Sequence, residues 1–141
     1  MQEAHILLVE DNEGDIFLTM DAFEESKLLT KISVVKNGAD ALDFLFQEGK
    51  YKDALKPDII LLDINIPIYN GQEVLKKIKA DPILKKIPVI MLTTSSSEKD
   101  IHEAYEYHAN SYVIKPLEME DFIAAVLKIE DFWLQLVKLA K

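Results

Sequence analysis

Hydrophobic residues follow two alternating patterns along the chain. Five short runs are apolar at nearly every position and rich in branched side chains, as in buried strands; they occupy residues 5–9, 32–35, 58–62, 88–92 and 111–114. Between them, apolar residues recur at intervals of three and four, which predicts helices at 14–27, 38–46, 71–80, 98–109 and 118–140. This alternation indicates an α/β fold: a doubly wound five-stranded parallel sheet covered by helices on both faces.

Polar residues stand where four of the predicted strands end. Glu10 and Asp11 follow the first strand, Asp63 the third, Thr93 the fourth and Lys115 the fifth. The carboxyl ends of parallel strands lie at one edge of the sheet, and the binding crevice of such sheets lies beyond that edge. We therefore expect these five side chains to converge although they are far apart in sequence.

Three carboxylates at one edge need a cation. Two of them would repel each other by about 4 kcal/mol at roughly 4 Å and an effective dielectric constant of about 20. Lys115 supplies one positive charge, and an all-oxygen site suits Mg²⁺. The same arrangement would make Asp63 an in-line nucleophile at phosphorus, with Lys115 and Thr93 contacting phosphoryl oxygens.

Length and composition narrow the function further. The chain has 141 residues, about the length of one domain, and no segment approaches the roughly 20 apolar residues of a membrane span, so a cytoplasmic location is expected. It has no cysteine, and its net charge of −9 would repel nucleic acid. All 16 basic residues are lysines, so arginine-based phosphate clamps are not available.

Several of these positions also have a purely structural explanation. Asn12 or Asp15 could cap the first helix, and Ser95 or Ser97 could cap the fourth. Tyr112, at the start of the last strand, could serve only packing. The conjunction of acids, a hydroxyl and an ammonium at four strand ends favours a functional site over these explanations.

Four segments carry a resemblance to a known family. VEDN, LLDINIP followed by a glycine, MLTT and SYVIKP resemble, in order and position, the receiver domain of two-component response regulators over roughly residues 4–128. The resemblance implies a flavodoxin-like sheet with strand order 2-1-3-4-5. It implies a switch that catalyses its own phosphorylation by a sensor histidine kinase and its own slow hydrolysis, and that signals through protein partners.

The resemblance also assigns roles at the metal site. Asp63 would be the phosphoryl acceptor and a Mg²⁺ ligand. Asp11 would bind Mg²⁺ directly, Glu10 would bind it through water, and the backbone carbonyl of Asn65 would complete the protein ligands.

Further roles fall on the fourth and fifth strands. Thr93 would be the switch hydroxyl, Tyr112 the switch aromatic residue and Lys115 the cation that pairs with the phosphoryl group. A cis peptide bond is expected before Pro116.

Two features resemble a subgroup of the family. The loop at 47–57 is longer than in a minimal receiver, and the last predicted helix continues past the usual end. Both are similar to single-domain regulators that partner phytochrome-type histidine kinases. A stand-alone receiver in another phosphorelay is the alternative.

The last helix predicts an interface. A single receiver domain of residues 1–141 would consist of a core at about 4–128 and an extension at about 129–141. Apolar residues continue through the extension, and a helix of this length exceeds what the sheet needs for cover. We expect Phe132, Trp133 and Leu136 to pack against a second copy, forming a homodimer.

Two other functions fit the fold class. Phosphatases that resemble the haloacid dehalogenases use a strand-end aspartate with Mg²⁺, but they need a second Asp two positions later, where this chain has Asn65. Flavin binding needs a glycine- and hydroxyl-rich phosphate loop after the first strand. Glu10 and Asp11 stand there instead and would repel the phosphate.

Overall fold

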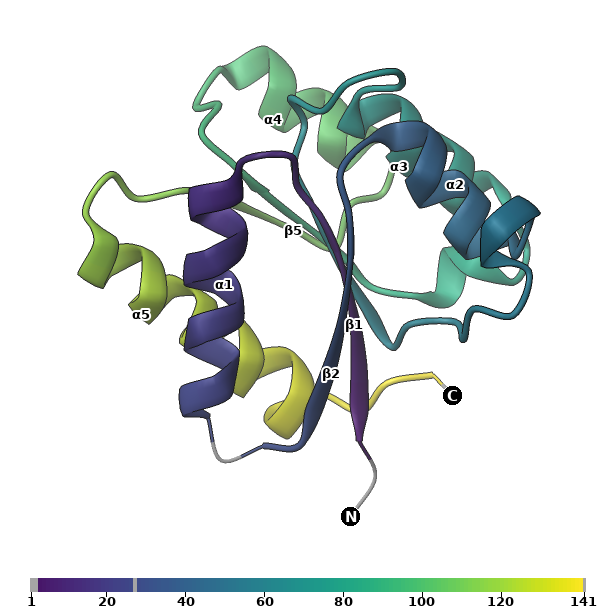
Figure 1. Ribbon diagram of the computed structural model, residues 1–141. Helices are drawn as coiled ribbons and strands as arrows, with labels where there is room; N and C mark the ends of the chain where they lie inside the picture. The colour runs from purple at the N-terminus through teal and green to yellow at the C-terminus, as the bar shows by residue number, and fades with distance from the viewer. Residues whose placement is uncertain (1–2, 27, 141) are drawn as a thin grey trace.

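The computed structural model describes residues 3–26 and 28–140 and contains one five-stranded parallel sheet. The strands are β1 (Ala4–Val9), β2 (Thr30–Val35), β3 (Ile59–Leu62), β4 (Val89–Thr93) and β5 (Ser111–Ile114). Their order is β2-β1-β3-β4-β5, so the predicted flavodoxin-like topology is confirmed. In Figure 1 the chain rises from the N-terminus along β1, and the carboxyl ends of the strands lie at the upper edge.

Two layers of helices cover the sheet (Figure 1). Helices α1 (Glu13–Glu25) and α5 (Met119–Glu130) lie on one face. Helices α2 (Gly38–Phe46), α3 (Gly71–Ala80) and α4 (Glu98–Glu106) lie on the other, with the short 3₁₀ turns η1 (Gly49–Tyr51) and η2 (Leu84–Lys86). None of the described helices combines the length and apolar character that a membrane crossing requires.

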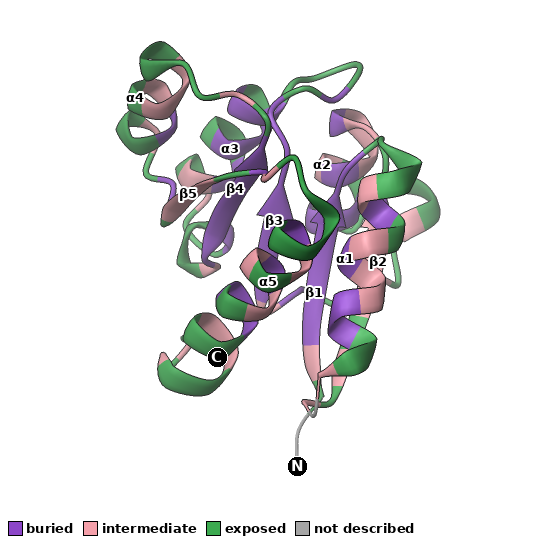
Figure 2. Ribbon diagram, turned by 90° about the vertical axis from the view of Figure 1, so that its left-hand side faces the viewer, coloured by how far each residue is buried: buried purple, intermediate pink, exposed green. Residues whose placement is uncertain are grey.

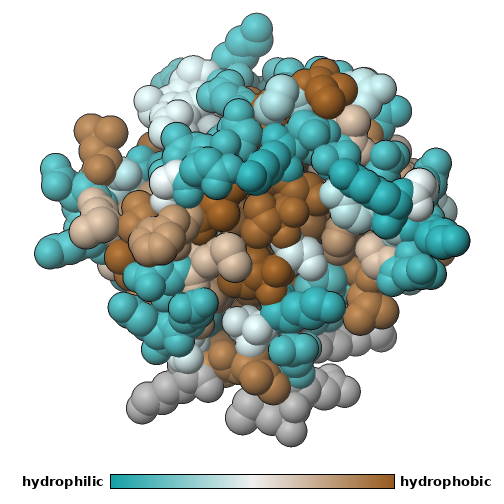
Figure 3. All heavy atoms as spheres, in the orientation of Figure 1, coloured by the Kyte–Doolittle hydropathy of each residue, from teal (hydrophilic) through white to brown (hydrophobic). Residues whose placement is uncertain are grey.

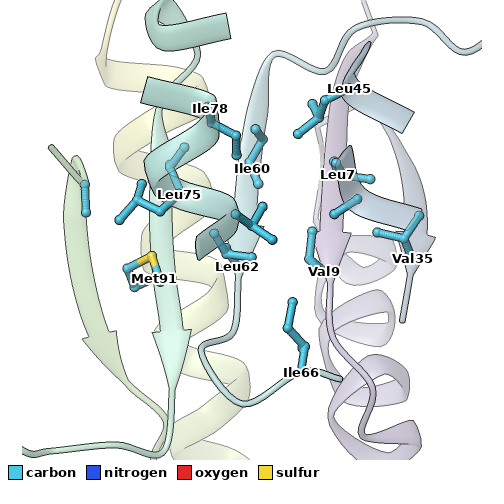
Figure 4. Packing of buried hydrophobic residues seen from close by; sticks show 14 of the residues in the cluster. Leu7, Val9, Val35, Leu45, Ile60, Leu62, Ile66, Leu75, Ile78 and Met91 are labelled. Atoms are coloured by element: carbon cyan, nitrogen blue, oxygen red, sulfur yellow. The ribbon is translucent and has the colours of Figure 1, made fainter. Parts of the chain in front are cut away.

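The inner strands β1, β3 and β4 are buried on both faces, as their continuous apolar runs predict, whereas the edge strands β2 and β5 are only partly buried (Figure 2). Successive side chains of a strand point to opposite faces, so Ile6 and Leu8 of β1 pack toward α1 and α5. Leu7 and Val9 pack on the other face with residues of β3 and α3 such as Leu75 (Figure 4). The alternation places one hydrophobic cluster on each side of the sheet.

The edge of the sheet at β2 is more exposed than the inner strands. Figure 3 shows apolar side chains exposed in the centre of the view, where Figure 1 shows the edge strand β2 between α1 and α2. A shallow groove at this edge is lined by residues that include Met20, Phe23, Leu29 and Ile32. The strand ends of the candidate site lie away from this groove, beyond the upper edge of the sheet.

Side-chain caps set the start of four helices. Asn12, Asn37, Asn70 and Ser97 each accept a hydrogen bond from the backbone amide three residues later, at the beginning of α1, α2, α3 and α4. Of the caps considered from the sequence, Asn12 and Ser97 are therefore the ones used. Asp15 and Ser95 are free for other contacts.

The last helix is extended, as predicted, but it is not one α-helix from 118 to 140. The α-helix α5 ends at Glu130, a π-helical turn η3 (Asp131–Leu136) follows, and residues 137–140 are not helical. The Val137 amide donates to the Phe132 carbonyl five residues earlier, which is the π-helical pattern. The sequence predicted a longer helix because residues 118–141 contain neither Gly nor Pro and the apolar spacing continues.

Candidate functional site

Backbone hydrogen bonds of the sheet continue one residue past the strands and position the site. The amide of Glu10 donates to the carbonyl of Val35, and the amide of Asp63 to that of Val9. After β5, the strand at the other end of the strand order, the Lys115 amide donates to the carbonyl of Thr93 at 2.7 Å. Glu10, Asp63 and Lys115 are therefore held in register at one edge, as the strand-end argument predicts.

Three carboxylates meet at this edge. One oxygen from each of Glu10, Asp11 and Asp63 lies within 4.8 Å of the others; Glu10 and Asp63 are buried and Asp11 is exposed. Burial raises the pKa of Glu10 to about 7; the nearby charge of Asp63 also raises it, while the hydrogen bond from Lys115 lowers it. An all-oxygen donor set, with an open side at Asp11, fits a hard divalent cation such as Mg²⁺.

The buried Lys115 side chain has three carboxylate partners. Its Nζ donates to Oδ2 of Asp15 at 2.9 Å, to Oδ2 of Asp63 at 3.2 Å and to Oε1 of Glu10. Burial lowers the pKa of Lys115, but the hydrogen bonds with Asp15 and Glu10 and the charge of Asp63 raise it overall. Lys115 is therefore a fixed positive charge beside the Asp63 carboxylate.

Asp15 is the residue of this cluster that sequence reasoning missed. The sequence presents it only as a candidate helix cap, yet its carboxylate lies against Lys115, one hundred positions away in the chain. Its position in the first turn of the helix that follows the first strand was the available signal, because that turn lies close to the strand end.

Thr93 and Tyr112 are linked through Ser95. The buried Thr93 hydroxyl accepts a hydrogen bond from the Ser95 amide at 3.4 Å, and the Tyr112 hydroxyl donates to the Ser95 carbonyl at 2.9 Å. Burial raises the pKa of Tyr112, so its hydroxyl is a donor at neutral pH. Thr93 therefore lies at the edge, and within the described residues no hydrogen bond joins it to Asp63.

The loop after β3 folds tightly around Asp63. The Asn65 amide donates to Oδ1 of Asp63 at 3.4 Å, and the Gly71 amide donates to the Ile64 carbonyl at 2.8 Å. A Cβ added at Gly71 would lie 2.2 Å from the carbonyl oxygen of Asp63. The start of α3 therefore packs directly on the backbone of Asp63, which explains the glycine at this position.

The expected cis peptide bond before Pro116 was wrong. No cis peptide bond occurs in residues 3–26 and 28–140. The trans form of a bond before proline is favoured by about 0.5–1 kcal/mol, and Lys115 reaches its carboxylate partners with the bond in this form.

Comparison of the sequence with known proteins identifies close relatives. Residues 6–127 match the model of the response regulator receiver domain family. Response regulator Rcp1 of Synechocystis is 42% identical over 134 residues, which are 95% of this chain and 91% of Rcp1. The probable methanogenesis regulatory protein FilR2 of Methanothrix harundinacea is 44% identical over 130 residues, 92% of this chain and 83% of FilR2.

Solved structures give the same result. The phosphorylated cyanobacterial phytochrome response regulator RcpA superposes with a TM-score of 0.97 at 42% identity, covering 99% of this chain and 100% of RcpA. The Mn²⁺-bound form of Rcp1 superposes with a TM-score of 0.95 at 40% identity, covering 98% of this chain and 99% of Rcp1. The chain therefore belongs to the response regulator receiver domain family, and its sequence and fold relate it to cyanobacterial phytochrome response regulators.

Proposed function

We propose that the protein is a phosphorylation-controlled switch in which Asp63 accepts a phosphoryl group from a sensor histidine kinase. The observation that carries the proposal is the place of Asp63, which is buried, belongs to the acidic cluster with Glu10 and Asp11, and accepts a hydrogen bond from the Lys115 ammonium. Membership of the receiver family and the Mn²⁺-bound structure of Rcp1 support a divalent cation in the reaction.

The transfer can be derived from the side chains at the site. An oxygen of Asp63 attacks phosphorus, a P–O bond forms, and the P–N bond to the kinase histidine breaks, with the electron pair leaving on the imidazole. Bound Mg²⁺ would neutralise charge on the phosphoryl group, held by Asp11, Asp63 and the Asn65 carbonyl, with Glu10 acting through water. Lys115 pairs with a phosphoryl oxygen, and hydrolysis by water later returns Asp63 to its free form.

The acceptor assignment is tested with acetyl phosphate and Mg²⁺. Intact mass should show one added phosphoryl group in the wild type, and none in Asp63→Asn, because an amide oxygen is a poor nucleophile. Asp53→Asn, which removes the charge of an exposed loop residue, is the matched control and should be phosphorylated normally. A phosphoryl group that persists in Asp63→Asn would refute the assignment.

Thr93 and Tyr112 are proposed to couple phosphorylation of Asp63 to a conformational change of the loop before α4. A phosphoryl oxygen would draw the Thr93 hydroxyl inward, away from the Ser95 amide, and Ser95 also anchors Tyr112. The loop before α4 would therefore rearrange with both side chains. A shift from 1:99 to 99:1 between two conformations requires about 5.5 kcal/mol, and charge-assisted hydrogen bonds to the phosphoryl group contribute to it.

Hydrogen exchange tests this route. Phosphorylation of the wild type should change the protection of α4 amides, and Thr93→Val should be phosphorylated without that change. Ser96→Ala, a hydroxyl deletion at an exposed position of the same loop, should respond as the wild type does. An unchanged α4 response in Thr93→Val would remove Thr93 from the switch.

A second copy of the chain is proposed to cover η3. Phe132 is 50% exposed and Leu136 is 74% exposed, while Trp133 is half-buried on the cluster between α1 and α5. A groove between β5 and α5 is lined by residues that include Val113, Phe132 and Trp133. In this proposal the receiver core ends near residue 128, and the extension from 129 onward provides the dimer contact.

Light scattering tests the dimer. The wild type should have the mass of two chains, and the double variant Phe132→Glu, Leu136→Glu should have the mass of one. Leu55→Glu places the same charge at an exposed leucine far from η3 in the chain and should leave the dimer intact. A monomeric wild type would contradict the proposal.

The relatives imply a sensor histidine kinase as partner, and the proposed kinase is of the phytochrome type. Phosphotransfer from a purified phytochrome-type kinase to Asp63 should then be faster than transfer from an unrelated histidine kinase. Equal rates would favour the alternative, a stand-alone receiver in another phosphorelay.

A further inference from the structure

Of the three carboxylates that contact Lys115, Asp15 lies apart from the strand ends. It lies on α1, and its Oδ2 is 2.9 Å from Nζ of Lys115, closer than the 3.2 Å to Oδ2 of Asp63. The carboxylate oxygens within 4.8 Å of one another come from Glu10, Asp11 and Asp63 and do not include Asp15. Asp15 therefore holds the ammonium without offering an oxygen to the acidic cluster.

Lys115 and a divalent cation would bind the same oxygens. Glu10 and Asp63 belong to the acidic cluster, and both accept hydrogen bonds from Lys115. A buried ammonium without an anionic partner is unfavourable. When Glu10 and Asp63 bind a divalent cation instead of Lys115, the ammonium therefore needs another carboxylate. Asp15 can meet that need.

The contact with Asp15 is also one that can be exchanged. The Lys115 side chain is buried, whereas the Asp15 side chain is 24% exposed and can be hydrated when the pair separates. A phosphoryl group carries more negative charge than a carboxylate and accepts charge-assisted hydrogen bonds. It can therefore take Lys115 from Asp15 without leaving a buried charge unpaired.

We propose that Asp15 is a positioning residue that competes with the bound phosphoryl group for Lys115. The inference rests on the proposed function, in which Lys115 pairs with a phosphoryl oxygen. Asp15 then acts with opposite signs on two equilibria. It strengthens Mg²⁺ binding, because it keeps Lys115 from holding Glu10 and Asp63, and it weakens the phosphorylated state, because it draws Lys115 away.

The test measures both equilibria in the full chain. Mg²⁺ binding is followed by calorimetry, and binding of fluoroberyllate, an analogue of the phosphoryl group, is followed by ¹⁹F NMR at saturating Mg²⁺. In Asp15→Asn the half-saturating Mg²⁺ concentration should rise about fivefold, and that of fluoroberyllate should fall about fivefold, as expected for loss of one partly exposed ion pair. A variant with a damaged site would bind both more weakly.

Three further variants make the test specific. Asp21→Asn removes the same charge from the same helix at a position with no hydrogen bond to Lys115, and both constants should match the wild type. Asp15→Glu keeps the charge and should restore wild-type binding of Mg²⁺ and fluoroberyllate. In a Lys115→Gln background, Asp15→Asn should change neither constant, because the competition is for the ammonium.

The outcomes separate this inference from the proposed function. A wild type that binds neither Mg²⁺ nor fluoroberyllate would overturn both. Wild-type binding with no change in Asp15→Asn, with both constants weakened, or with effects that persist in the Lys115→Gln background would overturn the role of Asp15 and leave Asp63 as acceptor.

Discussion

The residue next to the acceptor in space is a glycine eight positions later in the chain. Gly71 begins α3 against the backbone of Asp63, where a Cβ would lie 2.2 Å from a carbonyl oxygen. Gly71→Ala should therefore destabilise the protein by about 1–3 kcal/mol, as overpacking against immobile atoms does. Urea unfolding of the wild type and the variant would measure this loss.

Gly14 provides the control for that substitution. It lies in the first turn of α1, and a Cβ there would meet only the side chain of Asn12, at 3.3 Å. Alanine is favoured over glycine in a helix by up to about 1 kcal/mol, so Gly14→Ala should be neutral or stabilising. Equal losses in both variants would contradict the close approach at Gly71.

At the residue scale, side chains at strand ends are easier to predict from the sequence than contacts that reach across the site. Glu10, Asp63 and Lys115 were predictable because parallel strands end at one edge. The Asp15–Lys115 pair depends on how α1 lies relative to the end of β5, and no local pattern encodes that distance. The link through Ser95 between Thr93 and Tyr112 was missed for the same reason.

Between elements, a buried carboxylate joins the ends of α1 and α5. Glu130 is buried, and its Oε1 is hydrogen-bonded to Ser26, the residue that caps the C-terminus of α1. Burial raises the pKa of Glu130 above its usual value near 4.5; the charge of Asp131 also raises it, and the Ser26 hydrogen bond lowers it. Folding therefore shifts this carboxyl toward its protonated form.

This shift predicts a pH-dependent stability. The pKa of Glu130 is higher in the folded state than in the unfolded state. The stability that this group contributes is therefore complete at pH values below its pKa in the unfolded state, and it is lost as the pH rises through its pKa in the folded state. Glu130→Gln keeps a polar partner for Ser26 without a charge, so it should be more stable than the wild type at neutral pH. The difference should shrink as the pH falls toward 4.5, the usual value for this group.

Urea midpoints over a pH series would test the sign of this effect. Glu120 is exposed on the same helix, so Glu120→Gln should follow the pH dependence of the wild type. A Glu130→Gln variant that is less stable than the wild type at neutral pH would show that the ionised carboxylate is favourable in its site.

Element boundaries were predicted where a polar cap marks them. The predicted ranges of α2 and α3 agree with the structure, and an asparagine caps each. The end of α5 has no such signal. The apolar spacing continues through the π-helical turn, so periodicity alone does not mark where the α-helix stops.

On the scale of the whole molecule, binding of Mg²⁺ should raise the stability of the folded protein toward heat. A ligand that binds only the folded state stabilises it by about 2.7 kcal/mol at one hundred times its dissociation constant. At about 2–4 °C per kcal/mol, Mg²⁺ should raise the unfolding temperature by roughly 5–10 °C relative to a sample with chelator. Differential scanning calorimetry would measure the shift.

Loss of one cluster carboxylate should remove most of that shift. Asp11→Asn should melt as the wild type does in chelator or slightly higher, because it relieves repulsion with Glu10 and Asp63, and it should respond little to Mg²⁺. Asp53→Asn, in an exposed loop, should keep the full shift. An equal response of all three proteins would indicate that the ion acts elsewhere.

The register of the sheet has a consequence for how the protein moves. The amides of Glu10, Asp63 and Lys115 are bonded to carbonyls of adjacent strands at the carboxyl edge of the sheet, and all three residues are buried. Such amides exchange with solvent deuterium only when a large part of the molecule opens. The amides of Glu10, Asp63 and Lys115 should therefore stay protected in both the free and the phosphorylated protein. A backbone that does not move at these positions allows a small shift of side chains to change the surface.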